Sequence, residues 1–380
     1  MRALVAMSGG VDSSVAAALM LEAGHEVIGV TLKQWEGVDG AMPTAGCCTV
    51  SDSEDARRVA AQLGVPYYVL DYVARFTEQV VEPFGAAYLA GQTPNPCVEC
   101  NRTVRFSALL ERTDALGCDV LVTGHHARVR RDRDGWHLLK ATDGAKDQSY
   151  VLHMLGQDAL ARIRLPVGEM TKTEVRSRAG ELGLRTASKP DSQDICFVGK
   201  GDYREFLSDR FPTTAIPGPV VDMSGAVVAR HGGTANFTIG QRKGLGFATG
   251  TPRYVVDIRP ATAEVVVGTM DDLLADGVAV DDITFVSGMP PGDPAVEVKV
   301  RYRSRPVPAS LSATGAGEWT VRFEERQPAA APGQFAVFYR GDEVLGGGTI
   351  RSVIRLDRRP GGSDGRVAAG KPDGSQVADG

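Results

Sequence analysis

The residues that most clearly could do chemistry stand near the amino terminus, in the run Ser8-Gly9-Gly10-Val11-Asp12-Ser13-Ser14. This run follows a short apolar segment and opens a helical pattern. Backbone N–H groups at a helix start can donate to phosphate oxygens, and two glycines leave them uncovered. The serine hydroxyls add donors, and Asp12 could hold Mg²⁺ against the phosphates. The alternative is a capped glycine turn, but the order of strand, loop and helix favours a phosphate site.

Other strand ends should complete this pocket, because ligands in open α/β sheets bind beyond the carboxyl ends of the strands. Ala6 and Met7 end the first apolar run, Leu32 ends the second and Gly124 follows the fourth. His125 and His126 come directly after Gly124 and face the same crevice. A histidine at such a place is as often a structural residue, hydrogen-bonded within the protein, as it is a contact to a ligand.

Cysteines form a second group of candidate residues. Cys97 and Cys100 lie in the proline-bracketed segment TPNPCVECNR, before a helix that we expect over residues 103–116. A thiol just before a helix start feels the positive end of the helix dipole, and Arg102 is nearby in sequence. Both effects favour the reactive thiolate of Cys100. Cys196 lies in a second polar segment, SKPDSQDICF.

Three interpretations of Cys97, Cys100 and Cys196 stay open: a thiol relay, an iron-sulfur or zinc site built on the C-x-x-C, and inert thiols. An isolated C-x-x-C is a modest metal signal, and three cysteines would leave a fourth metal position open. We assign no resident metal ligand on this basis. Cys118 starts an apolar strand and should be a core residue, whereas the pair Cys47 and Cys48 is ambiguous.

A basic row is predicted near residue 300. If residues 295–302 form a strand, alternate side chains share one face about 6.6 Å apart. The row would consist of Lys299, Arg301, Arg303 and Arg305, with Val298, Val300 and Tyr302 facing the core. Such a row could meet successive phosphates of a nucleic acid, or it could be a solvated edge strand protected by charge. The loop with Gln241, Arg242 and Lys243 offers a similar basic surface.

The elements that must position these residues follow from the hydrophobic pattern. Apolar runs over residues 3–7, 27–32, 67–71 and 119–123 alternate with helical patterns over 12–23 and 52–63. This alternation predicts an α/β fold with a parallel sheet wrapped by helices. Prolines and glycines become frequent from about residue 200, which indicates a domain boundary there. Short strands expected over 295–302, 318–323, 335–339 and 343–350 predict a small β-barrel or sandwich.

Composition excludes several classes of protein. Among 380 residues, 42 Lys and Arg against 47 Asp and Glu give a net charge of −5. The protein therefore cannot bind nucleic acid through an overall positive charge, and a polyanion would have to bind at a local basic face. No apolar run approaches the roughly 18 residues that a membrane span requires. The amino terminus does not have the pattern of a secretory signal, so we expect a cytoplasmic protein with reduced cysteines.

The chain resembles the bacterial tRNA-specific 2-thiouridylases. The resemblance rests on six motifs in order: SGGVDSS, TPNPCVECN, GHHA, KDQSYVL, DSQDICFVG and IGQRKGLG. The first resembles the PP-loop of the N-type ATP pyrophosphatases. The resemblance implies a doubly wound parallel-sheet PP-loop domain (adenine nucleotide alpha hydrolase-like) over residues 1–200, a small mixed tRNA-contacting domain over 201–280 and a C-terminal β-barrel over 281–358. Residues 359–380 hold few bulky apolar groups and are expected to be a disordered tail.

The same resemblance implies a reaction. ATP would adenylate the C2 oxygen of the wobble uridine in a tRNA anticodon stem-loop, and sulfur from a protein persulfide would replace that oxygen. Cys196 would hold the persulfide, Cys100 would be the other catalytic cysteine, and the two could close into a disulfide. A persulfide donor such as a cysteine desulfurase or a sulfur-relay protein would be a partner. ATP would contact Ala6, Met7, Leu32, Gly124 and residues 8–14.

The residues implied to contact the tRNA are Asn95, Pro96, Cys97, His125, Lys146, Asp147, Gln148, Arg301, Tyr302 and Gln334. Family members often have Asp at the position of Cys97, and a thiol is a weaker general base, so the identity of that base stays open. Two other functions remain: a PP-loop synthetase that amidates a small carboxylate, and a nucleotide-responsive RNA-binding or iron-sulfur sensor without turnover.

Overall fold

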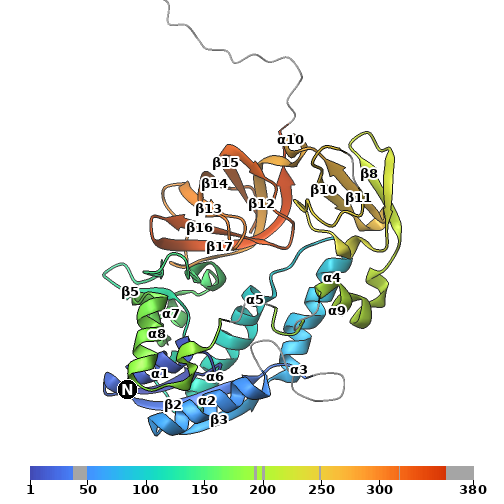
Figure 1. Cartoon of the computed structure of the whole chain (residues 1–380). Coiled ribbons are helices and arrows are strands. Elements are labelled where there is room, and N and C mark those ends of the chain that lie inside the picture. The colour runs from blue at the N-terminus through green and yellow to red at the C-terminus, as the bar shows by residue number, and fades with distance from the viewer. Residues whose placement is uncertain (37–48, 192–194, 199–201, 248–249, 316, 357–380) are drawn as a thin grey trace, which may run out of the picture.

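A computed structural model describes residues 1–36, 49–191, 195–198, 202–247, 250–315 and 317–356. Figure 1 shows three parts: a parallel sheet with helices around it, a smaller sheet drawn in yellow and brown, and a barrel drawn in orange and red. The predicted α/β class with a C-terminal barrel is confirmed. The cysteine pair 47–48 and the predicted tail over 359–380 lie outside the described residues. No helix in the described ranges is long and apolar enough to span a membrane.

The parallel sheet has the strand order β3-β2-β1-β4-β7. Its strands are β1 (Arg2–Ala6), β2 (Glu26–Lys33), β3 (Tyr67–Asp71), β4 (Val120–Val122) and β7 (Ile163–Arg164). Successive residues of a strand face opposite sides. Ala3 and Val5 accordingly pack in one hydrophobic cluster and Leu4 in another, so both faces of the sheet are covered.

Two groups of helices cover these faces. On the side of Ala3 lie α1 (Val11–Glu22), α2 (Val50–Leu63) and α8 (Lys172–Glu181). The other side carries α3 (Val73–Phe76), the π-helical η1 (Thr77–Val81), α4 (Glu82–Leu89), α5 (Pro96–Glu99), the π-helical η2 (Cys100–Ala108), α6 (Leu109–Ala115) and α7 (Gln157–Arg162). The helix expected over residues 103–116 therefore begins earlier than predicted. Its start is moved to Pro96 because Asn95 caps it and proline suits the first helical turn.

The middle part contains α9 (Tyr203–Arg210) and a four-stranded sheet of order β10-β11-β8-β9. The strands are β8 (Gly218–Asp222), β9 (Val227–His231), β10 (Tyr254–Arg259) and β11 (Glu264–Gly268). The helix α10 (Met270–Leu273) leads into the barrel. Short 3₁₀ turns complete the chain: η3 (Ser149–Leu152), η4 (Pro166–Glu169), η5 (Arg185–Ser188), η6 (Pro212–Thr214), η7 (Thr234–Asn236) and η8 (Pro260–Thr262).

The barrel is closed because its first strand pairs with its last. Its strands are β12 (Leu274–Phe285), β13 (Ala295–Lys299), β14 (Val307–Ala313), β15 (Trp319–Pro328), β16 (Phe335–Arg340) and β17 (Glu343–Ile354). The strand expected over residues 295–302 was predicted too long, since it ends at Lys299. A turn follows, in which the Ser304 N–H donates to the Arg301 carbonyl.

A hairpin from the first part of the chain extends the barrel sheet. It consists of β5 (Ala127–Arg131) and β6 (Trp136–Lys140), and β6 pairs with β17 at Glu343↔Leu139 and Val344↔Leu138. Figure 1 shows this hairpin between the parallel sheet and the barrel. Leu138 and Val344 are fully buried in one cluster, so the two parts share a hydrophobic core.

Candidate functional site

Residues 8–14, which are predicted to bind a nucleotide and are called the nucleotide loop below, join β1 to α1 as expected. Gly9 has a left-handed φ of +70°, and a Cβ atom there would stand 2.1 Å from the backbone oxygen of Asp52. Gly10 is the N-cap of α1 and has no side chain with which to cap the helix. The Ser14 hydroxyl donates to the Gly10 carbonyl at 2.8 Å, and the Ser8 N–H donates to the Ser13 hydroxyl at 3.1 Å. The loop is therefore tight and leaves the helix start uncovered by its own cap residue.

The end of β4 presses against this helix start. A Cβ atom at Gly124 would lie 2.5 Å from the Ser13 nitrogen, so only glycine allows this approach. His125 points into the interior, where its Nδ1 lies 2.8 Å from the Thr123 hydroxyl and its ring packs on Phe106. Burial lowers the pKa of His125 to about 3. The imidazole is therefore neutral and 7% exposed, which fits a structural role better than the substrate contact implied by the resemblance.

Asp12 is engaged by two partners from other parts of the chain. The Lys172 ammonium donates to both carboxylate oxygens at 2.8 and 2.7 Å, and His126 Nε2 lies 3.1 Å from Oδ1. Burial raises the pKa of Asp12, but the hydrogen bonds from His126 and Lys172 outweigh it and hold that pKa below its ordinary value. Both oxygens of Asp12 thus accept from an ammonium group, and the role of Asp12 as an Mg²⁺ ligand stays a prediction.

A second carboxylate, Asp191, continues this ionic network. It accepts hydrogen bonds from Lys146 at 2.8 Å and Arg176 at 2.9 Å, and Lys172 Nζ lies 2.9 Å from its Oδ1. Although burial raises the pKa of Asp191, the bonds from Lys146 and Lys172 lower it to about 2. Asp191 is thus attached to Asp12 of the nucleotide loop through Lys172.

Lys189 makes a second attachment two residues earlier. Its ammonium donates to the Gly9 carbonyl at 2.9 Å, to Asp52 at 2.6 Å and to Asp55 at 2.7 Å. Sequence reasoning missed Lys172, Lys189 and Asp191, because their partners lie far away in the chain and no local spacing marks them.

Cys97 and Cys100 occupy different environments. The Asn95 side chain accepts from the Cys97 and Val98 N–H groups at 3.2 and 3.4 Å, which puts Cys97 in the first helical turn, where it is exposed. Cys100 lies one turn inside the helix, is 7% exposed and accepts a hydrogen bond from Gln34 Nε2 at 3.2 Å. The prediction that Cys100 precedes the helix start was therefore wrong. Gln34, directly after β2, was missed.

Arg102 also differs from its predicted role beside the Cys100 thiol. Its guanidinium forms an ion pair with Asp282 of the barrel strand β12 and lies 5.9 Å from the centre of the Phe335 ring. Arg102 therefore joins the cysteine helix to the barrel.

Cys196 is half-buried and packs against the same hydrophobic cluster that contains Cys100. Its neighbour Phe197 is 4% exposed and contacts the rings of Phe84 at 5.1 Å and Trp35 at 6.1 Å. Since Trp35 follows Gln34, one short segment contacts the surroundings of both cysteines. Within the ranges that the structure describes, no group of three or more His, Cys, Asp or Glu side chains is arranged to hold a metal ion.

The residues implied to contact tRNA are divided between the two larger parts of the molecule. Gln334 Nε2 donates to the Thr93 carbonyl at 2.6 Å, and the Thr93 N–H donates to the Pro332 carbonyl at 2.8 Å. The barrel thereby holds the segment that contains Asn95, Pro96 and Cys97.

The motif KDQS has partners within the protein. Asp147 accepts from the Ala141 and Ser149 N–H groups at 3.0 and 3.1 Å, and the side-chain Oε1 of Gln148 accepts from the His126 N–H at 2.9 Å. Asp147 and Gln148 therefore support the turn in which they lie, and Lys146 joins that turn to Asp191.

The predicted basic row does not form, because the strand β13 ends at Lys299, the first residue of that row. Arg301 donates to the Ala329 carbonyl, and burial lowers its pKa. Lys299 lies 5.8 and 6.0 Å from the centres of the Tyr150 and Tyr302 rings. Tyr302, expected in the core, is 37% exposed, and the exposed arginines of this stretch are Arg303 and Arg305.

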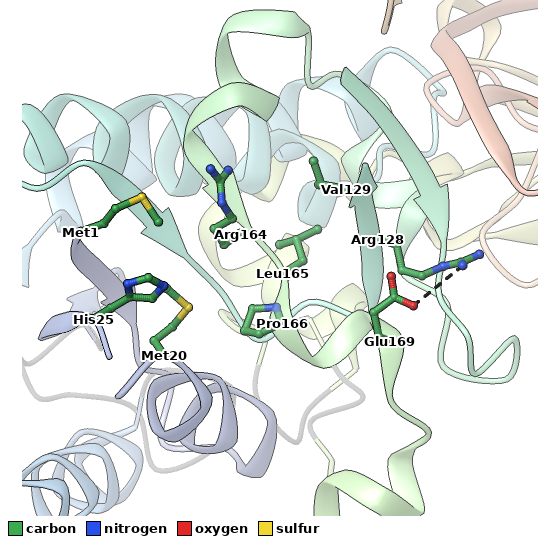
Figure 2. Close-up of a pocket in the computed structure, with 9 residues that line it drawn as sticks. All are labelled: Met1, Met20, His25, Arg128, Val129, Arg164, Leu165, Pro166 and Glu169. Atoms are coloured by element: carbon green, nitrogen blue, oxygen red, sulfur yellow. Dashed lines mark ion pairs between the residues drawn. The ribbon is translucent and has the colours of Figure 1, made fainter. Parts of the chain in front are cut away.

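A cavity of about 240 Å³ lies elsewhere, as Figure 2 shows. Met1, His25 and Arg164 line it, together with the ion pair between Arg128 and Glu169 at 3.9 Å. None of its lining residues belongs to the nucleotide loop or to the cysteine segments, so this cavity is not the candidate site.

Comparisons with known proteins identify related families along most of the chain. Three family models match along the chain: the tRNA methyl transferase HUP domain over residues 1–200, the tRNA methyl transferase PRC-barrel domain over 204–269 and the aminomethyltransferase beta-barrel domain over 275–350. The fold and these matches define a PP-loop protein of the ATP-utilising kind.

Whole-chain relatives identify the family more narrowly. The tRNA-specific 2-thiouridylase MnmA of Chloroflexus aggregans is 50% identical over 349 residues, which cover 91% of this chain and 97% of the relative. Proteins of the same name from a Roseiflexus species and Carboxydothermus hydrogenoformans are 49% and 48% identical, over 91% and 93% of this chain and 98% of each relative. The chain belongs to the family of tRNA-specific 2-thiouridylases, and it is an enzyme of the sulfurtransferase class.

Proposed function

We propose that this protein uses ATP to convert the wobble uridine of tRNA to 2-thiouridine. The observation that carries the proposal is the tight glycine loop at the start of α1, which is bound by Lys189, a residue of the motif that contains Cys196. Activation by a nucleotide and delivery of sulfur need both groups in one site. Similarity to tRNA-specific 2-thiouridylases along 91% of the chain supports the same reaction.

The first step is adenylation. The uridine C2 oxygen attacks the α-phosphate of ATP and pyrophosphate leaves. The nucleotide lies against residues 6–14, Leu32 and Gly124, and the helix start stabilises the negative charge of the phosphates. ATP enters as its magnesium complex, and Asp12, which also accepts from Lys172, is the residue that would hold that magnesium.

The second step is sulfur transfer. Cys196 carries a persulfide whose terminal sulfur attacks C2, and AMP leaves with the former uridine oxygen. Cys100 then attacks the inner sulfur of Cys196; the bond between the two persulfide sulfurs breaks, and a disulfide forms between the cysteines. A thiol reductant must return both to thiols. The hydrogen bond from Gln34 Nε2 to the Cys100 sulfur, at 3.2 Å, orients the thiol that makes this attack.

The tRNA anticodon loop binds where the barrel meets the cysteine helix. Asn95, Pro96 and Cys97 line the pocket for the splayed base, since loops of RNA can present an unstacked base. Tyr302 lies beside this pocket and offers an exposed ring to a base or a sugar. The other residues implied to contact tRNA support these surfaces through hydrogen bonds within the protein. They are Lys146, Asp147, Gln148, Arg301, Gln334 and His125.

Pyrophosphate release tests the proposal. Purified protein with ATP should release pyrophosphate only when unmodified tRNA is added, and tRNA from a strain depleted of the protein should lack 2-thiouridine by nucleoside mass spectrometry. Release that depends on a small carboxylate would instead indicate a synthetase. No release with any tRNA, together with normal nucleosides, would indicate a binding protein.

A further inference from the structure

One ion pair ties the helical turn of Cys100 to the barrel. Arg102, two residues after Cys100, contacts the Asp282 carboxylate of β12 through Nη1. Glu99 Oε2 is 4.0 Å from Arg102 Nε, which is too far for a hydrogen bond. In the part of the chain that the structure describes, the buried Nε and Nη2 atoms of Arg102 have no hydrogen-bond acceptor. Asp282 is therefore the group that holds this guanidinium.

The backbone at Asp282 is unusual. Its φ is +48°, in the left-handed region that few residues other than glycine adopt. Where β12 pairs with β17, three steps along β12 from Asp281 to Thr284 match two steps along β17, so β12 contains one extra residue. Such a β-bulge changes the direction in which a side chain points, and bulges are frequent next to active sites. Asp282 lies in this bulge, and its carboxylate meets the helix that carries the cysteines.

The partner strand β17 has a sequence that fits the bulge. Gly346 and Gly348 lie opposite it, and Cβ atoms there would be 2.2 Å from the Thr284 oxygen and 2.5 Å from the Asp281 oxygen. Side chains do not approach backbone oxygens so closely, so both positions need glycine. The two strands together fix the conformation that presents Asp282.

The rest of the Arg102 side chain is enclosed by aromatic rings. The guanidinium carbon lies 5.9 Å from the centre of the Phe335 ring, which is 5.2 Å from the ring of His153. His153 is fully buried, and its Nδ1 is 2.8 Å from the Tyr150 carbonyl oxygen. The helical turn of Cys100 therefore cannot rotate without moving Arg102 away from both the barrel ring and the barrel carboxylate.

The barrel thus holds the cysteine segment at two separate points. Gln334 fixes the Thr93 carbonyl, before the residues that line the base pocket, and Asp282 fixes Arg102, after Cys100. A displacement of about 1 Å at a reacting group can lower a rate about a hundredfold. The second contact is close enough to Cys100 to control where its sulfur lies.

We propose that Arg102 is a positioning residue for Cys100, and that the bulge at Asp282 fixes Arg102 in the orientation this requires. The inference rests on the proposed function, because it takes Cys100 as the thiol that attacks Cys196. Arg102 itself touches neither the tRNA nor the sulfur in this arrangement.

The experiment compares Arg102→Met, Arg102→Lys and Asp282→Asn with a matched control, Arg128→Met. Arg128 also pairs with a barrel carboxylate, Asp342, at 3.0 Å. The exposed fractions of the two side chains are 26% and 64% in the first pair and 21% and 69% in the control pair. Asn tolerates a left-handed backbone, so Asp282→Asn removes the charge and keeps the bulge.

Alkylation of Cys100 measures its position without tRNA. The protein is treated with iodoacetamide, and modified Cys100 is quantified by peptide mass spectrometry. Cys100 is 7% exposed, so wild type should react slowly. Arg102→Met should react about tenfold faster, because losing a hydrogen bond between charged groups favours local opening. Asp282→Asn should also react faster, whereas Arg102→Lys and Arg128→Met should react like wild type.

A single round of sulfur transfer by protein with a persulfide on Cys196 is the second readout. Arg102→Met should form 2-thiouridine about tenfold more slowly or worse, and Arg102→Lys should restore most of the rate. Pyrophosphate release with tRNA should change much less, because adenylation uses no thiol and Gln334 still holds the base pocket. Equal losses in both steps would mean that the ion pair only stabilises the fold, and would overturn the inference.

The remaining outcomes separate this inference from the proposed function. Equal alkylation of Cys100 in Arg102→Met and Arg128→Met would overturn the inference. If Arg102→Met does not fold, Asp282→Asn decides: wild-type alkylation and transfer would overturn the inference, and faster alkylation with slower transfer would support it. If wild type releases no pyrophosphate with tRNA, the proposed function fails, while the alkylation comparison still decides whether Arg102 holds Cys100.

Discussion

At the scale of single residues, the two glycines of the nucleotide loop have different tasks. Gly9 adopts a left-handed backbone conformation against α2, and a side chain there would collide with the Asp52 carbonyl. Gly10 has an extended backbone with φ of −93°, and a Cβ atom there would meet only the Ser8 hydroxyl oxygen, at 3.5 Å. Gly9 therefore fixes the path of the chain, whereas Gly10 keeps the helix start open.

We expect Gly9→Ala to lower the free energy of unfolding by about 2 kcal/mol or more, from the left-handed backbone and the contact with Asp52. ATP binding should be lost as well. Gly10→Ala is the matched control and should fold with nearly normal stability. Thermal unfolding and ATP titration measure both effects, and a Gly9→Ala protein as stable as Gly10→Ala would contradict this account of the loop.

The cysteines differ in their expected effect on sulfur transfer. Cys196→Ser and Cys100→Ser should each stop formation of 2-thiouridine, because one removes the persulfide carrier and the other the attacking thiol. Cys97→Ser should be tolerated, since a relay uses only two thiols. Cys118→Ala is the control, because that thiol lies at the entry of β4, where burial raises its pKa. All four variants should still release pyrophosphate with tRNA.

The measurement is nucleoside mass spectrometry of tRNA after reaction with a persulfide donor. Iron and labile sulfide should be assayed in protein purified without oxygen. A Cys97→Ser variant as inactive as Cys100→Ser, in a wild type that contains stoichiometric iron and sulfide, would contradict the relay and indicate a metal cluster.

At the scale of elements, the turn after β13 divides four basic residues into two kinds. Lys299 and Arg301 are partly covered by Tyr150, Tyr302 and Ala329, whereas Arg303 and Arg305 face solvent. Any tRNA phosphate that meets this surface must contact the second pair.

We predict that Arg303→Ala and Arg305→Ala each reduce the slope of the logarithm of tRNA affinity against the logarithm of salt concentration by about one. Each variant makes one phosphate contact fewer, so fewer counterions are released when tRNA binds. Arg301→Ala should instead lower the melting temperature, because the Ala329 carbonyl loses its donor. Filter binding over a range of salt concentrations tests the first effect. An unchanged slope in Arg303→Ala and Arg305→Ala would mean that this turn is plain solvated surface.

The sequence predicted those elements whose evidence is local. The apolar runs that became β1 to β4, and the glycine loop between β1 and α1, follow from spacing within about ten residues. The end of β13 was missed because the alternation of basic and apolar residues continues through the turn. The start of the cysteine helix was missed because Pro96 was interpreted as part of a loop, although proline also suits a first helical turn.

Contacts between distant segments could not be predicted from spacing at all. Lys172 meets Asp12 across 160 residues, and Gln34 meets Cys100 across 66. Such pairs depend on how the sheet brings its strand ends together, and a single sequence contains no periodicity that marks them. The site's residue types were visible in the sequence, but the partners that set their charge were not.

At the scale of the whole molecule, a histidine joins the hairpin to the barrel. His137 Nδ1 lies 2.6 Å from Glu343 Oε1, and its Nε2 lies 2.8 Å from Asp132 Oδ1. The hydrogen bond with Glu343 is the largest cause that raises the pKa of His137 above its ordinary value. The folded protein therefore favours the charged imidazole, which lies between two carboxylates.

This arrangement predicts a pH-dependent contribution to stability. A raised pKa in the folded state stabilises the protein fully below the pKa of the unfolded chain, and the benefit disappears as pH rises through the folded pKa. His137→Gln should therefore lower the melting temperature more at pH 6 than at pH 9. His231→Gln is a control of opposite sign, because burial lowers the pKa of His231. A His137→Gln effect that does not change with pH would contradict the prediction.

The pairing of β6 with β17 has a consequence for synthesis of the chain on the ribosome. Residues 136–140 emerge early, but their partner strand consists of residues 343–354, which are translated much later. Until then the outer edge of β6 has unpaired backbone groups and the apolar side chain of Leu138 lacks its cover. Gln334, which holds the Thr93 segment, also arrives late. We therefore expect the part of the chain that contains β6 to complete its folding only after β17 has been made, and a form truncated before β17 to be prone to aggregation.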